Sequence, residues 1–193
     1  MQTFFVKIGN IFYEWVSCFF STNLLYCNSG AKNACKKGWV DMEKIASFCI
    51  NHDTLMPGMY ISRTDGDVIT YDVRFVRPNM PPYLPTDAMH TIEHLVATYV
   101  RNSVFKDGII YFGPMGCRTG FYFLTRGIAH ADAIRLMREA MAFCADFEGE
   151  IPGATQAECG NWLEHDLPTA RQWAASMAAV LDGYTEAQLT YPA

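Results

Sequence analysis

The sequence DVITYDVRFVR at residues 67–77 alternates between apolar and polar side chains from Ile69 to Phe75. Successive side chains of a β-strand point to opposite faces, so this pattern predicts a strand that is buried on one face. Its apolar face consists of Ile69, Tyr71, Val73 and Phe75, and its polar face of Thr70, Asp72 and Arg74. Residues 59–63 precede the strand across a turn at residues 64–66 and are its expected hairpin partner.

Helix and strand patterns follow one another along the rest of the chain. A proline-rich loop ends at Pro85, and apolar residues then recur at helical spacing to about Ser103, with Thr86 or Asp87 placed to cap this helix. Residues 108–112 and 119–125 predict strands, and residues 132–147 and 169–181 predict helices. This order predicts an α+β fold in which helices pack on one face of a largely antiparallel sheet.

The first of these helices carries His90-Thr91-Ile92-Glu93-His94, an H-x-x-E-H motif. His90 and His94 are four residues apart, so they lie on one helix face about one turn apart. This spacing allows two imidazoles to bind one metal ion, with Glu93 beside them as a general base, although a polar stripe facing solvent has the same pattern. A catalytic site needs a third protein ligand, for which the available residues are Cys117, Cys159, His52, His130 and His165. We interpret His130 and His165 as capping or packing residues.

Seven cysteines without a C-x-x-C pair indicate a reducing, cytoplasmic setting in which single thiols can serve metal binding or catalysis. Cys144 lies in the middle of a predicted helix and Cys49 lies between apolar residues, so both are predicted to be buried and inert. Cys159 lies in a loop next to Gly160, where the backbone can bend to present a thiolate. Cys117 ends a tight turn and precedes Arg118, an arrangement that can expose and activate a thiol.

The composition excludes some classes of partner. Half of the 193 residues are apolar and 18% are charged, which is typical of one folded domain. With a net charge of −5 the chain has no basic stripe for phosphate groups, so no nucleic-acid partner is expected. No apolar run approaches the roughly 20 residues of a membrane-spanning helix, so no membrane partner is expected.

The first 41 residues differ from the rest. They are rich in aromatic residues and hold four lysines against two acidic residues, whereas residues 42–193 carry 11 basic and 18 acidic residues. We expect residues 1–41 to be a poorly ordered leader, either a targeting segment or upstream sequence ahead of a native start at Met42. Residues 42–193 are expected to form a single domain.

Five segments of the chain together resemble a known family. They are ASF at residues 46–48 with His52, YDVRF at 71–75, HTIEH at 90–94, GPMGCRTGFY at 113–122 and IPGATQAECGN at 151–161. In this order they resemble S-ribosylhomocysteine lyase, the LuxS family of bacterial autoinducer-2 synthesis. The resemblance runs from about Met42 to near residue 170, which supports Met42 as the native start.

The resemblance implies a fold, an activity and an assembly. The expected fold is the α+β fold of the LuxS and metallopeptidase kind, with residues 42–193 as one metal-dependent lyase domain. The expected enzyme is a cytoplasmic carbon–sulfur lyase that converts S-ribosylhomocysteine to homocysteine and 4,5-dihydroxy-2,3-pentanedione, the autoinducer-2 precursor, by metal-assisted enolisation and β-elimination. A homodimer with its active sites at the subunit interface is implied. Both a quorum-sensing role and a metabolic role in the methionine cycle stay open.

The resemblance also implies roles for individual residues. The ligands of one divalent metal per subunit are His90, His94 and Cys159, and this metal is Fe(II) in the cell, with Zn(II) or Co(II) able to substitute. The catalytic acid/base residues are Cys117 and Glu93, and the substrate site is lined by Ser47, His52 and Arg74. The chain departs from the pattern at Tyr111, where many family members carry an aspartate, which puts one polar contact of the pocket in question.

Two other readings compete with this one. An H-x-x-E-H metallopeptidase of the inverzincin kind would use Glu93 to activate a metal-bound water, but its third ligand would be a glutamate and Cys117 would have no role. A structural metal site is normally closed by four protein ligands, so it would need Cys117 as a fourth ligand beside His90, His94 and Cys159.

Overall fold

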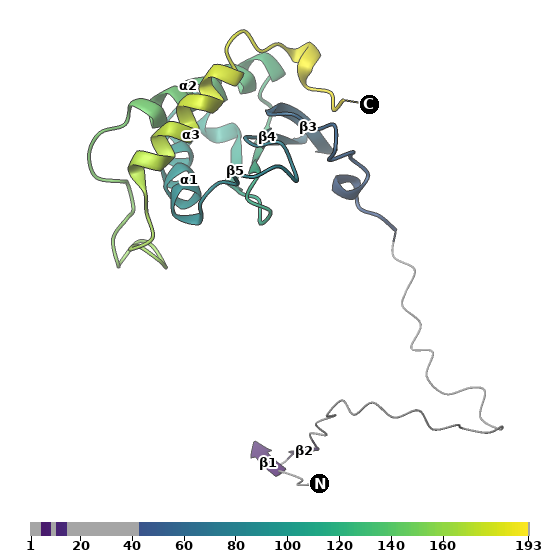
Figure 1. The fold of residues 1–193 in the computed structure, drawn as a ribbon, viewed down its shortest axis with the longest axis vertical. Coiled ribbons are helices and arrows are strands. Elements are labelled where there is room, and N and C mark those ends of the chain that lie inside the picture. Colours follow the sequence, from purple (N-terminus) through teal and green to yellow (C-terminus); the bar gives the residue numbers. More distant parts are fainter. Residues whose placement is uncertain (1–4, 9–10, 15–42, 193) are drawn as a thin grey trace, which may run out of the picture. The chain divides into compact units, whose positions relative to one another are not determined.

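The computed structural model in Figure 1 describes residues 5–8, 11–14 and 43–192. The chain divides into two units, residues 1–42 and residues 43–193. In the first unit, strands β1 (Phe5–Ile8) and β2 (Ile11–Glu14) form an antiparallel pair. The other residues of the expected leader lie outside the described part of the chain, so its expected poor order stays a prediction.

A four-stranded antiparallel sheet forms the framework of the second unit. It consists of β3 (Gly58–Asp65), β4 (Val68–Arg74), β5 (Ile109–Pro114) and β6 (Gly120–Arg126), in the order β3-β4-β6-β5. The predicted hairpin forms between β3 and β4, with Asp65 paired to Val68. Gly66 in its turn has a φ of 62°, a left-handed conformation that glycine adopts without strain. The antiparallel sheet predicted from the sequence is therefore confirmed.

Three helices pack against this sheet, as Figure 1 shows: α1 (Thr86–Arg101), α2 (His130–Asp146) and α3 (Leu167–Val180). Short 3₁₀ helices lie at η1 (Ala46–Phe48), η2 (Lys106–Gly108) and η3 (Glu186–Gln188). Helix α1 begins after Pro85, so neither Thr86 nor Asp87 is the N-cap residue, but the Asp87 carboxylate accepts a hydrogen bond from the backbone N–H of Ala88 at 2.8 Å in the first turn. None of the helices that the structure describes combines the length and the apolar character needed to cross a membrane.

The hydrophobic core lies between the sheet and the helices. Tyr71 and Val73 point from β4 into this core, and α1 contributes Ile92 and Leu95, all with no exposed surface. Cys144 of α2 is also buried there, as predicted, and burial raises the pKa of its thiol to about 12.

Two predictions about burial are wrong. Cys49 is exposed rather than buried, because it follows η1, which packs against β3. The polar face of β4 is also buried: Asp72 is 1% and Arg74 is 3% exposed. The reason is the C-terminal segment, since Tyr191 stacks on Tyr60 at 5.0 Å and its hydroxyl donates to Asp72 at 2.9 Å.

The close approach of β6 to β4 gives a first testable prediction. Gly120 pairs with Arg74, and a Cβ at this position would collide with the backbone carbonyl oxygen of Val73. We expect Gly120→Ala to lower the free energy of unfolding by about 1–3 kcal/mol, the usual cost of overpacking. Urea denaturation measures this loss. Gly116→Ala is the matched control, because no atom lies within 4 Å of its Cβ position, and equal midpoints for the two variants would contradict the prediction.

Candidate metal centre and thiol pocket

Helix α1 presents two imidazoles on the side opposite its buried face. The Nδ1 atom of His90 lies 2.8 Å from the carbonyl oxygen of Glu164, and Nδ1 of His94 lies 2.7 Å from the carbonyl oxygen of Pro152. A carbonyl only accepts hydrogen bonds, so Nδ1 carries the proton in both rings. The lone pair of each neutral ring therefore lies on Nε2, which is the state of a histidine that binds a metal.

Cys159 joins these rings from the loop between α2 and α3. Its Sγ lies 3.3 Å from Nε2 of His90, and the backbone N–H of Asn161 donates to the same sulfur at 3.4 Å. The loop holds its shape in part because the backbone N–H of Cys159 donates to the carbonyl of Thr155. A cysteine sulfur and two imidazoles therefore converge on one point.

A fourth residue, His165, lies in the same cluster. The Thr91 hydroxyl donates to the carbonyl of Asp87 at 2.9 Å, so Nδ1–H of His165, 3.2 Å away, donates to Thr91 Oγ1. Its Nε2 is buried and has no hydrogen-bond partner among the described residues. Burial, and then the neighbouring rings of His90 and His94, lowers the pKa of His165, which favours the neutral ring.

The four side chains form a group suited to a metal ion. One ligand atom from each of His90, His94, Cys159 and His165 lies within 4.8 Å of the other three. The ring of His165 stacks on that of His90, with centroids 4.1 Å apart. The interpretation of His165 as a capping or packing residue was therefore incomplete. His130 does pack, with its Nδ1 2.6 Å from the hydroxyl of Tyr71.

Two cavities lie on either side of the turn at residues 114–116. The first, which we call the metal-side cavity, measures ≈ 400 Å³ and is lined by His90, Glu93, Arg118 and Asn161 among others. The second, the thiol-side cavity, measures ≈ 310 Å³ and is lined by Ser47, His52, Asp72, Arg74, Cys117 and Tyr191 among others. Pro114, Met115 and Gly116 line both. The predicted acid/base residues Glu93 and Cys117 thus line different cavities of one chain.

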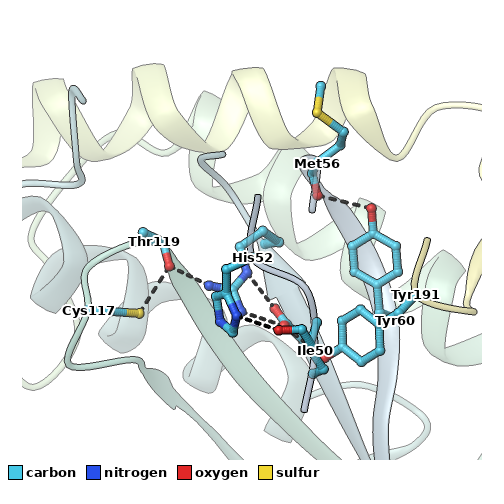
Figure 2. A network of polar contacts seen from close by, with 9 residues as sticks. Ile50, His52, Met56, Tyr60, Cys117, Thr119 and Tyr191 are labelled. Atoms are coloured by element: carbon cyan, nitrogen blue, oxygen red, sulfur yellow. Dashed lines mark hydrogen bonds and ion pairs between the residues drawn. The ribbon is translucent and has the colours of Figure 1, made fainter. Parts of the chain in front are cut away.

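A buried ion pair forms the floor of the thiol-side cavity. Arg74 donates from Nε to Asp72 Oδ1 at 3.1 Å and from Nη2 to Oδ2 at 2.5 Å. Its Nη1 donates to the hydroxyl oxygen of Thr119, which lies 3.0 Å from Sγ of Cys117. Figure 2 shows this chain of contacts from Cys117 through Thr119 towards Tyr191. Two of the five N–H groups of Arg74 remain available to a ligand.

The remaining predicted substrate residues lie around this floor. Ser47 of η1 and His52 line the cavity, and Nδ1–H of His52 donates to the carbonyl of Ile50 at 2.9 Å, which leaves its Nε2 free to accept. Tyr111 lies in an adjoining hollow: it is 45% exposed on edge strand β5 and shares this hollow with Ser47 and Tyr122, which also line the thiol-side cavity.

The sequence profile of S-Ribosylhomocysteinase (LuxS) matches residues 45–187. The chain belongs to this LuxS family. The matched region contains all eight residues that the sequence analysis assigned to metal, catalysis and substrate. The resemblance inferred from five short segments is therefore confirmed.

Curated LuxS relatives are similar along nearly their whole length. The S-ribosylhomocysteine lyase of Clostridium acetobutylicum is 50% identical over 157 residues, which cover 78% of this chain and 99% of the relative. The enzymes of Porphyromonas gingivalis and Phocaeicola vulgatus are 49% and 48% identical over 158 residues, again 78% of this chain and 99% and 98% of the relative.

The cluster gives a second prediction, on metal binding. We expect His90→Ala and Cys159→Ala to retain much less Co(II) or Zn(II) than the parent, because each removes a ligand atom from the cluster. Metal per chain after gel filtration, measured by plasma emission spectroscopy, tests this. His130→Ala should keep the parent's metal content, since His130 contacts Tyr71 and not the cluster. Full metal content in either ligand variant would refute the assignment.

Proposed function

We propose that this LuxS-family chain cleaves S-ribosylhomocysteine to homocysteine and 4,5-dihydroxy-2,3-pentanedione, as a metal-dependent carbon–sulfur lyase of autoinducer-2 synthesis. The observation that carries the proposal is the His90, His94 and Cys159 cluster beside Glu93, in a chain about half identical to curated S-ribosylhomocysteine lyases. We assign this activity to residues 42–193 as one lyase domain, with residues 1–41 as a leader outside it.

His90, His94 and Cys159 are the residues that would hold one divalent metal per subunit. Imidazole and thiolate ligands suit Fe(II), Zn(II) and Co(II), and we propose Fe(II) in the cell with the other two able to substitute. When bound, the metal would act as a Lewis acid that polarises the substrate carbonyl and makes the adjacent C–H more acidic. The free thiols of Cys117 and Cys159 fit a reducing, cytoplasmic location.

The other residues of the site move protons. The thiolate of Cys117 removes a proton from the carbon next to the carbonyl and returns it to the neighbouring carbon, so the carbonyl migrates along the chain without net redox change. Glu93 removes the proton whose loss expels the homocysteine thiolate, which breaks the C–S bond by β-elimination. In this proposal a thiolate moves the proton of the isomerisation steps, and a carboxylate removes the proton of the elimination step.

Arg74, Ser47 and His52 bind and orient the substrate in this proposal. The two N–H groups of Arg74 that remain free can donate to hydroxyl or carboxylate oxygens. Because Asp72 holds the guanidinium in place, Arg74 loses little side-chain freedom when the substrate binds.

We propose a homodimer with its active sites at the interface. Within one chain, Glu93 and the metal cluster lie on one side of the turn at residues 114–116, whereas Cys117 lines the other side. Large apolar side chains beside these cavities are exposed, among them Phe48 at 72% and Leu163 at 76%. Such exposure is typical of a surface that a second copy covers.

The third prediction tests the lyase reaction. Protein purified anaerobically with Fe(II) or Co(II) should release homocysteine from S-ribosylhomocysteine, detected by a thiol reagent. We expect Cys117→Ala and Glu93→Gln to lose about 10²–10⁴-fold in turnover while keeping their metal, because each lacks an acid/base group but no ligand. Wild-type turnover in either variant would remove that residue from the mechanism.

The fourth prediction tests the dimer. His52→Ala and Cys159→Ala alter opposite sides of the turn, so co-expressed chains should form mixed dimers in which one site of two is intact. We expect the mixture to recover about a quarter of parental activity, although each variant alone is nearly inactive. Recovered activity should vanish when the two proteins are kept as separate homodimers. Mixed dimers without activity would show that each site belongs to a single chain.

A further inference from the structure

Thr119 lies between Cys117 and Arg74 and has no role in the mechanism proposed above. It is 3% exposed and immediately precedes β6. Its hydroxyl oxygen lies 3.0 Å from Sγ of Cys117 (Figure 2), and it accepts a hydrogen bond from Nη1 of Arg74. The two residues given separate roles above, an acid/base thiol and a substrate-binding guanidinium, are therefore connected through one hydroxyl group.

The direction of the hydrogen bond from Arg74 follows from the groups themselves, whereas the direction of the contact with Cys117 depends on whether the sulfur is a thiol or a thiolate. A guanidinium has N–H donors and no acceptor, so Thr119 Oγ1 must accept from Arg74. The single hydrogen of the hydroxyl is then free, and Sγ of Cys117 lies within reach to receive it. A hydroxyl that accepts from a cation is polarised and becomes a stronger donor, and its best acceptor is an anion, the thiolate.

The position of Thr119 is fixed from both sides. Its carbonyl oxygen accepts hydrogen bonds from the backbone N–H groups of Phe75 at 2.9 Å and Val76 at 3.1 Å. On the other side, Asp72 holds Arg74 through both carboxylate oxygens, and Tyr191 donates to Asp72 in turn. Arg74 therefore cannot turn away from the Thr119 hydroxyl without breaking the buried ion pair, and the Thr119 backbone cannot shift without breaking its pairing with Phe75 and Val76.

We propose that Thr119 is a positioning residue whose hydroxyl holds the thiolate form of Cys117 and transmits to it the charge of Arg74. This inference deepens the proposed function, because it concerns the thiol assigned there as acid/base. It explains why the turn places a threonine two residues after the cysteine: a hydroxyl on β-branched Thr119 has few rotamers, so its donor direction is set in advance.

Other ionisable groups face the same cavity and contribute to the state of the thiol. From β4 these are Asp72 and Arg74, from β6 Tyr122, from the segment after η1 His52, and from the C-terminal segment Tyr191. Burial, followed by the charge of Asp72, raises the pKa of both Tyr122 and Tyr191, so these phenols stay neutral at physiological pH. Arg74 is thus the cation linked to Cys117, and its link runs through Thr119.

The test is the pH dependence of alkylation at Cys117 in the metal-loaded full chain. Iodoacetamide reacts with the thiolate, and peptide mass spectrometry reports the rate at Cys117 with exposed Cys49 as an internal reference. In Thr119→Val we expect the rate profile of Cys117 to move to higher pH, with a rate at neutral pH at least about tenfold lower, the usual effect of losing a hydrogen bond to a charged group. Thr119→Ser keeps the hydroxyl and should restore the parental profile.

Two controls separate this role from a structural one. Thr70→Val is the matched substitution, because Thr70 Oγ1 is buried on β4 and has no hydrogen-bond partner in the described chain, and it should leave the Cys117 profile unchanged. If Thr119→Val does not fold, Thr119→Ala, which introduces no new methyl group, takes its place. Thermal unfolding and metal content of each variant identify any general loss of structure.

The outcomes are distinguishable from failure of the lyase proposal, since alkylation requires no turnover. A Cys117 profile in Thr119→Val and Thr119→Ala equal to that of the parent would overturn the role of Thr119. A shifted profile that Thr119→Ser does not restore would also overturn it, because the hydroxyl would then be irrelevant. A shift without any lyase activity in the parent would support the hydroxyl contact and refute the proposed reaction instead.

Discussion

The buried ion pair between Asp72 and Arg74 is the interaction on which much of this structure depends. Two charges removed from water are costly, and they are tolerated only when every oxygen and most N–H groups find partners. The chain supplies these partners from distant segments: Tyr191 reaches Asp72 from the C-terminal end, and Thr119 reaches Arg74 from the turn before β6. Strand β4 thereby becomes the place where the tail, the thiol-bearing turn and the sheet are joined.

Helix α1 contributes both to the hydrophobic core and to the candidate metal site. Its face with Ile92 and Leu95 is sealed against the sheet and the other helices, which fixes the rotation of the helix. The opposite face then presents His90 and His94 at a fixed angle, and carbonyl groups of the loop after α2 select the tautomer of each ring. The orientation of the two imidazole rings is therefore set by backbone carbonyl groups of another segment as well as by the H-x-x-E-H motif.

The features predictable from the sequence are those set by local geometry. The alternation from Ile69 to Phe75 predicted β4, and the spacing of His90 and His94 predicted a shared helix face, because both depend on periods of two or four residues. His165 was only one of five candidates for a third ligand in the sequence, since its place in the cluster depends on a loop that returns to Thr91 from 74 residues away. Burial of the polar face of β4 was missed for the same reason, because Tyr191 lies 119 residues beyond Asp72.

The turn at residues 114–116 lines both cavities, and this has a thermodynamic consequence. A wall common to two binding spaces cannot move for one without changing the other. A ligand that fills the space near Glu93 and shifts the turn must change the affinity of the space near Cys117 for its own ligand. A ligand in the space near Cys117 must then change the affinity of the first space by the same factor. In the proposed dimer the two cavities of one chain belong to different active sites, so a ligand that moves this turn in one site would also change the affinity of the other site.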